Sequence, residues 1–451
     1  MAEHGGAARI ATALARIEAV RRFTVHSRVM RITGAVIEAS SAHVAIGEVC
    51  RIETVTGGSV DAEVVGFHER GILLMPLGEL EGIHPGAVVQ PLGRTIDIGV
   101  GDGLIGRVLD GLGRPLDGLG SLGPTDRRPI TAAPPHPLAR TRITAPLGTG
   151  IRAIDGLLTL GRGQRAGIFS GSGVGKSVLL GMIARGTTAD VNVIALLGER
   201  GREVRDFIER DLGPEGLRRS VVVVATGDQA ALIRAKGALV ATAIAEHFRD
   251  QGRDVLLMVD SVTRVATAWR EIGLAAGEPP TTKGYPPSVF AALPKLLERA
   301  GTDRHGSITG LYTVLVEGDD FNEPIADATR AILDGHLVLS RQLANIAQFP
   351  AVDTLESVSR LRDQVLDPDH RRALEQVLRL EAAYRSHADL IAVGAYKPGA
   401  NRDVDAAIAM RDEMLAFLTQ RPDEYTTPRE TRDRLLALAA LSSRPRAERS
   451  A

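Results

Sequence analysis

Residues 165–186 read RAGIFSGSGVGKSVLLGMIARG, an apolar strand that enters a glycine-rich loop and leaves it as an apolar helix ending near Gly186. The loop glycines carry no side chain, so successive backbone N–H groups can converge on phosphate oxygens. The helix that follows presents its positive end to the same point. Lys176 can then reach the terminal phosphates, and the Ser177 hydroxyl can hold Mg²⁺. The stretch therefore predicts a phosphate-binding loop.

One position departs from the strict pattern G-x-x-x-x-G-K-[ST], which has glycine where this chain has Ser170. An ordinary glycine-rich turn that contains Lys-Ser is the alternative interpretation. The strand before the loop and the helix after it favour phosphate binding. The predicted nucleotide-binding residues of the loop are Ser170, Gly171, Ser172, Gly173, Val174, Gly175, Lys176 and Ser177.

The composition is that of a globular protein, with 44% hydrophobic and 24% charged residues in a chain of 451, long enough for two or three domains. A formal net charge of −1 gives no overall preference for nucleic acid or membranes. Cys50 is the only cysteine, which excludes an internal disulfide and fits a reducing compartment. No apolar run approaches the ~20 residues of a membrane span, and residues 1–23 lack a secretory signal pattern. We expect a cytoplasmic protein.

The patterning divides the chain into five segments. They are an N-terminal helix (1–23), a small antiparallel β-barrel (24–97), a Gly/Pro-rich connector (98–142), a P-loop domain with a mostly parallel sheet (143–368) and a C-terminal helical domain (369–451). The first helix, over residues 7–22, has an apolar stripe, and residues 1–23 together carry a charge of +2. Such a helix either packs on its own protein or docks on a partner or a membrane surface.

Short strands separated by glycines indicate the barrel. We predict them at 29–37, 43–52, 60–67, 72–76 and 87–90. A barrel that binds RNA needs stacking aromatics and positive charge. This one has a single aromatic after Thr24, Phe67, and five arginines against eight carboxylates. The barrel is therefore expected to be structural and not to bind nucleic acid.

The connector contains the spacing G-x-G-x-x-G at Gly101, Gly103 and Gly106, which is the dinucleotide-binding fingerprint. That fingerprint needs a helix directly after it. Here two more glycines and Pro115 follow within ten residues, so we interpret the connector as linker and turns.

Two acidic residues follow apolar strands of the P-loop domain. Glu199 comes after VNVIALLG and Asp260 closes VLLMVD, so both are expected at neighbouring strand ends, facing the phosphates. One such carboxylate typically orders Mg²⁺ and a second can polarise the attacking water. For Glu199 the alternative is a salt bridge within its own segment ERGRE, where Arg200 and Arg202 lie close by.

Longer runs carry a resemblance to a known family. They are GSGVGKS, GERGREVRDF (198–207), VDSVTRVATAWREI, KGYPPSVFAALPKLLERAG (283–301), TVLVEGDDFNEPIADATRAILDGHLVLSR (313–341) and FPAVDTLESVSR (349–360). Together they resemble the ATPases of type III protein export, relatives of the catalytic subunit of the rotary ATP synthase. The resemblance covers nearly the whole chain, and within the family it is greatest to the flagellum-specific ATPase, often named a flagellum-specific ATP synthase.

The resemblance implies a RecA-like P-loop ATPase domain that binds ATP and Mg²⁺. Lys176 would neutralise the β and γ phosphates, Ser177 would ligate Mg²⁺, and a small residue is usual at the position of Ser170. Glu199 would activate the water, and Asp260 would be the second acidic residue of the metal site.

Further roles also follow from the resemblance alone. Arg360 matches the family's arginine finger, which acts on a neighbouring subunit's nucleotide. Phe349 matches an aromatic that packs on adenine, with a place in the core as its alternative. Arg264 is either structural or positions the γ-phosphate, and Tyr396 is left unassigned.

The resemblance further implies a homo-hexameric ring at the cytoplasmic face of the inner-membrane export apparatus, peripherally associated with the membrane. Its N-terminal region would bind a regulatory partner. Its helical C-terminal region would face the export gate, chaperones and unfolded export substrates. ATP hydrolysis would drive delivery and unfolding of those substrates.

Four other functions remain open at this point. They are an injectisome (virulence) type III secretion ATPase, a catalytic subunit of a rotary ATP synthase, an RNA-dependent hexameric translocase, and a nucleotide-binding subunit without catalysis. The acidic, aromatic-poor barrel argues against the translocase, and Glu199 argues against the subunit without catalysis.

Overall fold

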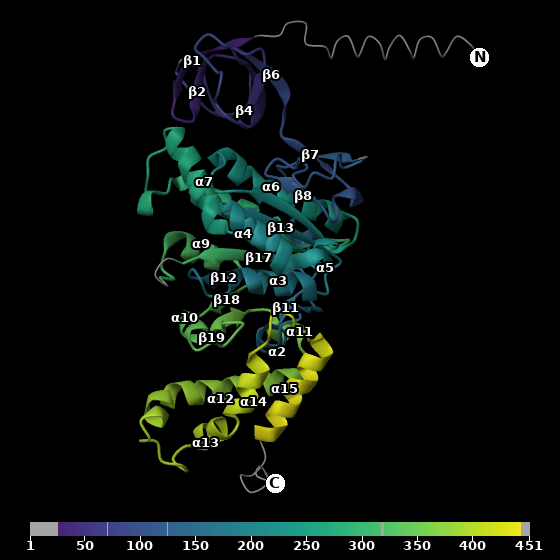
Figure 1. The fold of residues 1–451 in the computed structure, drawn as a ribbon, viewed down its shortest axis with the longest axis vertical. Helices are drawn as coiled ribbons and strands as arrows, with labels where there is room; N and C mark the ends of the chain where they lie inside the picture. The colour runs from purple at the N-terminus through teal and green to yellow at the C-terminus, as the bar shows by residue number, and fades with distance from the viewer. Residues whose placement is uncertain (1–25, 70, 124, 317–319, 443–451) are drawn as a thin grey trace, which may run out of the picture. The chain divides into compact units, whose positions relative to one another are not determined.

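The computed structural model describes residues 26–69, 71–123, 125–316 and 320–442 (Figure 1). The predicted N-terminal helix at 7–22 lies outside these residues. The chain forms two compact units that divide between Ile96 and Asp97, with residues 275–277 belonging to the first. The first unit holds the barrel, and the second holds the parallel sheet and the C-terminal helices.

The barrel is closed and antiparallel, in the order β1-β2-β5-β4-β3-β6. Its strands are β1 (Ser27–Thr33), β2 (Val36–Ser40), β3 (Glu48–Glu53), β4 (Ser59–His68), β5 (Gly71–Pro76) and β6 (Val88–Thr95). Inward-facing side chains such as Ile37, Ile52 and Leu74 are fully buried. The prediction of one strand over 29–37 is wrong, because Gly34, at φ 57°, turns the chain and β1 pairs with β2 as a hairpin.

The connector contributes to the second unit. Its strand β7 (Asp97–Val100) pairs with β9 (Asp126–Pro129), and β8 (Val108–Asp110) is an edge strand beside β14 (Ser220–Ala225). The expectation of linker and turns is therefore wrong at β7, β8 and β9. The rejection of the dinucleotide fingerprint is confirmed, since the 3₁₀ turn η1 (Asp102–Leu104) interrupts it and β8, not a helix, follows it.

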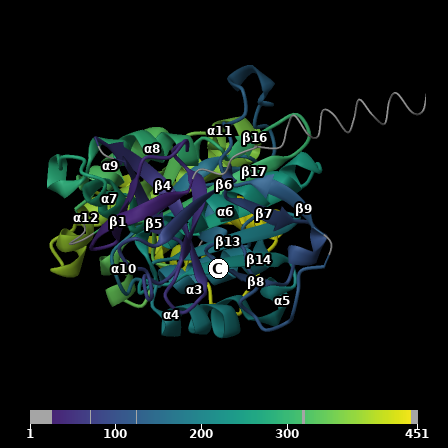
Figure 2. The same cartoon turned by 90° about the horizontal axis from the view of Figure 1, so that it is seen from above.

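The main sheet has the order β19-β18-β12-β17-β15-β13-β14-β8, and Figure 2 shows β13, β14 and β8 side by side. Its other members are β12 (Arg165–Ser170), β13 (Val191–Leu197), β15 (Asp254–Asp260), β17 (Ser307–Leu315), β18 (Gly335–Leu339) and β19 (Val352–Ser359), with β16 (Gly301–Thr302) beside β17. A separate two-stranded sheet pairs β10 (Pro146–Leu147) with β11 (Leu160–Gly161). The neighbours from β18 to β8 are parallel, and β19 is antiparallel to β18. Every residue of β13 and β14 is buried, which accounts for sequences that are apolar apart from Asn192 and Ser220, two residues that hydrogen-bond each other at 3.2 Å.

Helices connect and cover these strands. They are α2 (Arg152–Leu157), α3 (Lys176–Gly186), α4 (Gly201–Asp206), the π-helical turn η3 (Phe207–Leu212), α5 (Gly213–Leu217), α6 (Ala231–Asp250), α7 (Val262–Ala275), α8 (Pro287–Leu297), α9 (Pro324–Ile332), α10 (Arg341–Asn345) and α11 (Arg362–Val365), with 3₁₀ turns η2 (Pro137–Ala139) and η4 (Thr282–Gly284). A buried bidentate ion pair fixes α6, because Arg299 donates to both Glu246 oxygens at 2.8 Å and also to the carbonyl of Ile130. Arg299, two residues before β16, thus joins the connector to α6.

The C-terminal region is helical, as predicted. Its helices are α12 (Pro368–Ala392), α13 (Arg402–Ala409), α14 (Arg411–Leu418) and α15 (Pro428–Ser442). Their apolar side chains share one core with the P-loop domain. Arg152 of α2 is buried against them and donates to the carbonyl of Phe417 at 3.0 Å and to the Thr426 hydroxyl at 3.1 Å. These bonds fasten the helices to the domain that carries the glycine-rich loop.

Candidate active site

The glycine-rich loop joins β12 to α3 as the sequence predicted. Gly173 and Gly175 have φ values of 78° and 86°, which a residue with a Cβ adopts only with strain. α3 begins at Lys176, and Ser177 is exposed on its first turn. The backbone at the start of α3 is thus free to receive an anion at the positive end of the helix.

The two strand-end carboxylates lie together beside this loop. β13 and β15 are neighbouring parallel strands, so Glu199 and Asp260 follow at adjacent carboxyl ends. Lys176 Nζ lies 2.5 Å from Asp260 Oδ1 and 3.5 Å from Glu199 Oε1. The structure therefore brings together the lysine of the loop and both acidic residues that the sequence singled out.

The arginines near Glu199 have other partners, which argues against the alternative of a salt bridge within the segment ERGRE. Arg200 pairs with Glu203 at 3.6 Å, and Arg202 pairs with Asp206 at 2.9 Å. The arginines of the ERGRE segment are therefore paired along their own helix, while Glu199 turns toward Lys176.

Burial sets the electrostatics of this cluster. Burial raises the pKa of the Glu199 carboxyl, the charge of Lys176 opposes the rise, and the charge of Asp260 adds to it. Burial alone lowers the pKa of Lys176, but Asp260 and Glu199 together raise it above its ordinary value. Lys176 is thus held protonated between two carboxylates, one of which is shifted toward the pKa of a general base at neutral pH.

Thr313 is a member of the cluster that the sequence did not reveal. It lies on β17, the strand between β12 and β15, and is fully buried. Its Oγ1 donates to Asp260 Oδ1 at 2.6 Å. A threonine within an apolar strand carries no signal of its own, and only the strand order places it beside Asp260.

Phe349 lies against the loop from the side of the C-terminal region. Its side chain is 40% exposed, and a Cβ built on Gly175 would lie 3.5 Å from its ring. The carbonyl of Phe349 accepts a hydrogen bond from the backbone N–H of Gln420 at 2.8 Å. The ring is thus held next to the loop with one part open, which is incompatible with a place in the core.

Arg360 lies far from the loop of its own chain. The last residue of β18, Leu339, pairs with Ser170, which precedes the loop. The first residue of β18, Gly335, lies at the opposite ends of the parallel strands. The antiparallel strand β19 ends at Ser359, which pairs with Gly335. Gly335 and Leu339 are four residues apart on β18, a distance of about 13 Å along the strand. Arg360 is therefore exposed at the ends of the strands away from its own phosphate-binding loop.

The two residues of unsettled role have different surroundings. The stem of Arg264 packs on Gly198, where a Cβ would come within 2.8 Å of it, so this arginine adjoins the residue before Glu199. Tyr396 is in the C-terminal region, where its hydroxyl donates to Asp405 at 3.1 Å and its ring packs on His387.

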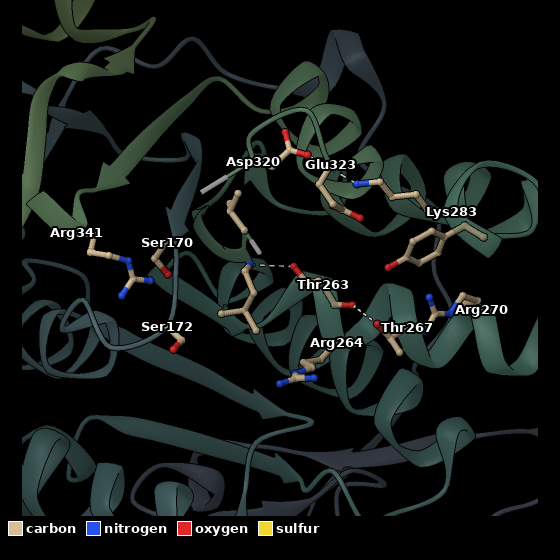
Figure 3. A pocket seen from close by; sticks show the side chains of 13 residues that line it. Ser170, Ser172, Thr263, Arg264, Thr267, Arg270, Lys283, Asp320, Glu323 and Arg341 are labelled. Atoms are coloured by element: carbon tan, nitrogen blue, oxygen red, sulfur yellow. Dashed lines mark hydrogen bonds and ion pairs between the residues drawn. The ribbon is translucent and has the colours of Figure 1, made fainter. Parts of the chain in front are cut away.

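A pocket of about 630 Å³ adjoins the loop (Figure 3). Arg341 and the serines of the loop lie along one wall, and α7 supplies another with Thr263, Arg264, Thr267 and Arg270. The Ser170 hydroxyl is buried there and has no hydrogen-bond partner among the described residues. The guanidinium of Arg270 stacks on the ring of Tyr285, 4.9 Å from its centroid. Arginine and hydroxyl side chains are thus numerous in the lining of the pocket next to the phosphate-binding loop.

The residues present fit a magnesium ion that arrives with a nucleotide. Within the described part of the chain, no three His, Cys, Asp or Glu side chains are grouped as a metal site would require. Magnesium at phosphate sites uses one or two protein oxygens and completes its shell with phosphate and water. Ser177 and Asp260 can supply such oxygens.

The chain matches known families over most of its length. Residues 29–93 match the beta-barrel domain and residues 150–359 the nucleotide-binding domain of the ATP synthase alpha/beta family, and residues 366–437 match the T3SS EscN ATPase C-terminal domain. The flagellum-specific ATP synthase of Bacillus subtilis (strain 168) is 53% identical over 431 residues, 95% of this chain and 97% of the relative. The chain belongs to the family of flagellum-specific and type III secretion ATPases.

Other members of the family are similarly close. The type 3 secretion system ATPase of Xanthomonas euvesicatoria is 50% identical to this chain, over 94% of this chain and 96% of the length of that ATPase. The assembled ATPase EscN in complex with its central stalk EscO, from the enteropathogenic E. coli type III secretion system, has a TM-score of 0.85 and 44% identity, covering 92% of this chain and all of that one. As an ATPase of the ATP synthase alpha/beta family, the chain has ATP as its implied ligand. None of the helices in the described ranges is long and apolar enough to cross a membrane.

Proposed function

We propose that this chain hydrolyses MgATP as the motor of type III protein export in the flagellar export apparatus. The observation that carries the proposal is the cluster of Lys176, Glu199 and Asp260 at the phosphate loop, in a chain with 53% identity to a flagellum-specific ATP synthase. A P-loop without an acidic cluster would support binding alone.

The proposed chemistry assigns one task to each residue of the cluster. Lys176 leaves the carboxylates for the β and γ phosphates, and Ser177 and Asp260 hold the magnesium ion, which supplies charge neutralisation at the phosphates when it is bound. Glu199, with its raised pKa, takes the proton of the attacking water. Phe349 packs on the adenine at the other end of the site.

The proposed assembly is a homo-hexameric ring, and the position of Arg360 supports it. An arginine at the sheet edge away from its own loop cannot stabilise phosphoryl transfer there, but it can do so at the loop of a neighbouring copy. EscN, which covers nearly the same length, is known as an assembled ATPase.

The proposed partners follow the family. A regulatory partner would bind the N-terminal region, a stalk subunit like EscO would enter the ring, and the C-terminal helices would face the export gate, chaperones and unfolded cargo. The ring would work at the cytoplasmic face of the inner membrane.

The injectisome is the second candidate, because a type 3 secretion system ATPase is 50% identical to the chain. A rotary ATP synthase subunit is disfavoured by the match of residues 366–437 to the EscN C-terminal domain. We expect the chain to restore swimming to a Bacillus subtilis strain that lacks its own flagellum-specific ATP synthase. Restoration of effector secretion in a Xanthomonas strain, with no effect on swimming, would favour the injectisome instead.

The enzymatic part is tested with the purified chain. Phosphate release from ATP is measured without RNA, with and without Mg²⁺, over a range of protein concentrations. We expect a Mg²⁺-dependent rate per subunit that rises with concentration as rings form. A chain that binds ATP but never releases phosphate would overturn the proposal.

A further inference from the structure

We infer that Thr313 is a positioning residue for the metal site: its buried hydroxyl fixes the Asp260 carboxylate so that one oxygen serves the protein and the other faces the nucleotide-bound cation. The inference rests on the proposed function, since it assigns a task at the same site. It concerns a residue on β17, a strand that contributes none of the predicted site residues.

The hydroxyl of Thr313 has one preferred acceptor. A threonine hydroxyl donates a single proton, and Asp260 Oδ1 at 2.6 Å is much closer to it than the carbonyl of Val259 at 3.4 Å. Thr313 is fully buried and Asp260 is 4% exposed, so water does not compete for this bond. A bond to a charged acceptor in such surroundings is one of the stronger kinds.

Both contacts of the carboxylate fall on the same oxygen. Lys176 Nζ and Thr313 Oγ1 each bond Asp260 Oδ1, and within the described chain no residue donates to Oδ2. The carboxylate plane is therefore set from one side, by a lysine on α3 and a threonine on β17. The second oxygen is left for a ligand.

The two contacts differ in permanence. Lys176 sits on the phosphate loop and must turn to the phosphates when a nucleotide binds, which removes it from Asp260. Thr313 is held in the middle of the sheet, where it pairs in register with Ile168 of β12. It cannot follow the lysine. When Lys176 leaves, Thr313 remains as the donor that keeps the buried carboxylate oriented and its charge hydrogen-bonded.

The same strand offers a matched control. Thr309 lies four residues earlier on β17, so its side chain points to the same face of the sheet, and it is equally buried. Its hydroxyl accepts a hydrogen bond from the N–H of Gly163 at 2.8 Å, at the edge of the sheet away from Asp260. Thr309→Val therefore removes a buried hydroxyl of β17 without touching the site.

The experiment measures binding of a fluorescent ATP analogue to the full chain as Mg²⁺ is titrated. Thr313→Val keeps the volume and removes the hydroxyl. We expect unchanged binding in EDTA, a roughly tenfold rise in the Mg²⁺ concentration at half-saturation, and recovery of most of that loss in Thr313→Ser. Thr309→Val should titrate like the unmodified chain.

Three results would overturn the inference: an unchanged Mg²⁺ midpoint in Thr313→Val, a Thr313→Ser variant no better than Thr313→Val, or an equal shift in Thr309→Val. The last would identify a general effect of disturbing β17. Because the readout is binding, the inference is decided even if the unmodified chain binds MgATP and does not hydrolyse it, a result that would overturn only the proposed function.

Discussion

Lys176 is the central residue of the site, because its ammonium group contacts the carboxylates of both Asp260 and Glu199. An incoming triphosphate must compete for this ammonium group with two carboxylates. A cation that arrives with the triphosphate compensates the carboxylates that the lysine leaves. Nucleotide and Mg²⁺ are therefore expected to bind together more tightly than either binds alone.

Glu199 can be tested by removing its charge alone. Glu199→Gln keeps the volume and the contact with Lys176, but an amide cannot accept a proton from water. We expect ATP binding within a few-fold of normal and a hydrolysis rate lower by roughly 10²–10⁴, the range for a lost general base. Single-turnover phosphate release and nucleotide titration measure the two effects.

The control for this variant is Glu209→Gln. It makes the same change at an exposed glutamate on η3 that pairs with Arg205 of α4. It should be as active as the unmodified chain. Full activity in Glu199→Gln would remove Glu199 from the mechanism and leave the activation of water to another group.

The pH dependence of the rate follows from the same residue. Burial and the charge of Asp260 raise the pKa of Glu199 against the opposing charge of Lys176. A base works only when ionised, so acidification through this raised pKa protonates it and lowers kcat. We expect the acid side of the pH profile to fall at a higher pH than an ordinary glutamate would give. The residual rate of Glu199→Gln should lack this fall, and its persistence there would assign the titration elsewhere.

The site residues divide into those that sequence could reveal and those that it could not. Lys176, Glu199 and Asp260 could be predicted, because a glycine-rich loop and carboxylates at strand ends follow from the rules of parallel sheets. Thr313 could not be predicted, because no local sequence pattern shows that β17 lies between β12 and β15. The distance of Arg360 from its own loop depends likewise on the antiparallel pairing of β19.

At the scale of elements, hydrophobic patterning was sufficient where a strand is buried on both faces. The strand before Glu199 was predicted from the run VNVIALLG, which is apolar apart from Asn192, and β13 forms there with every residue buried. β8 was missed because three residues among glycines look like a turn, and they become a strand only through pairing with β14. The hairpin of β1 and β2 was missed because apolar residues lie close to Gly34 on both sides, so this single glycine gave no clear turn signal.

The packing of α3 gives a prediction about an element. A Cβ on Gly181 would lie 2.4 Å from the carbonyl oxygen of Asp211 in η3, and a backbone atom cannot rotate away. Alanine favours a helix by about 1 kcal/mol over glycine, but this overlap should cost about 1–3 kcal/mol or more. We therefore expect Gly181→Ala to lower the urea midpoint of unfolding and to weaken nucleotide binding at the loop that α3 follows.

Gly201→Ala is the matched control, because a Cβ there meets nothing within 4 Å and the residue begins α4 on the same side of the site. Its unfolding midpoint should stay the same or rise slightly. Equal midpoints for both variants would show that η3 shifts to accommodate the added methyl group, and that the close contact of α3 with η3 does not limit stability.

At the scale of the whole molecule, the sheet separates the two halves of the proposed catalytic machinery. Lys176, Glu199 and Asp260 gather at the carboxyl ends of the parallel strands, and Arg360 lies at the other edge. A single chain therefore carries the phosphate-binding cluster at one end of its strands and the arginine at the other end, so neither end forms a complete site. Copies arranged head to tail complete the sites, and a closed ring leaves none unfilled.

This arrangement predicts that two inactive variants rescue each other. Arg360→Ala alone should bind ATP and lose roughly 10³-fold or more in rate, as for other arginine fingers, and Glu199→Gln should also be inactive. In mixed rings, an Arg360→Ala subunit keeps its Glu199 and can receive the intact arginine of a Glu199→Gln neighbour. Random mixing in equal amounts produces such pairs at about a quarter of the interfaces, so the mixture should recover a rate of that order.

An arginine that acted on its own chain would give a different result, since every subunit of the mixture would then lack one of the two residues. The mixture would be no more active than either variant alone. Arg362→Ala, which removes a neighbouring arginine on α11 paired with Asp363 at 3.7 Å, should be active by itself and shows that the loss is specific to position 360. Recovery in the mixture, together with an active Arg362→Ala, would require that the nucleotide of one copy is completed by the next.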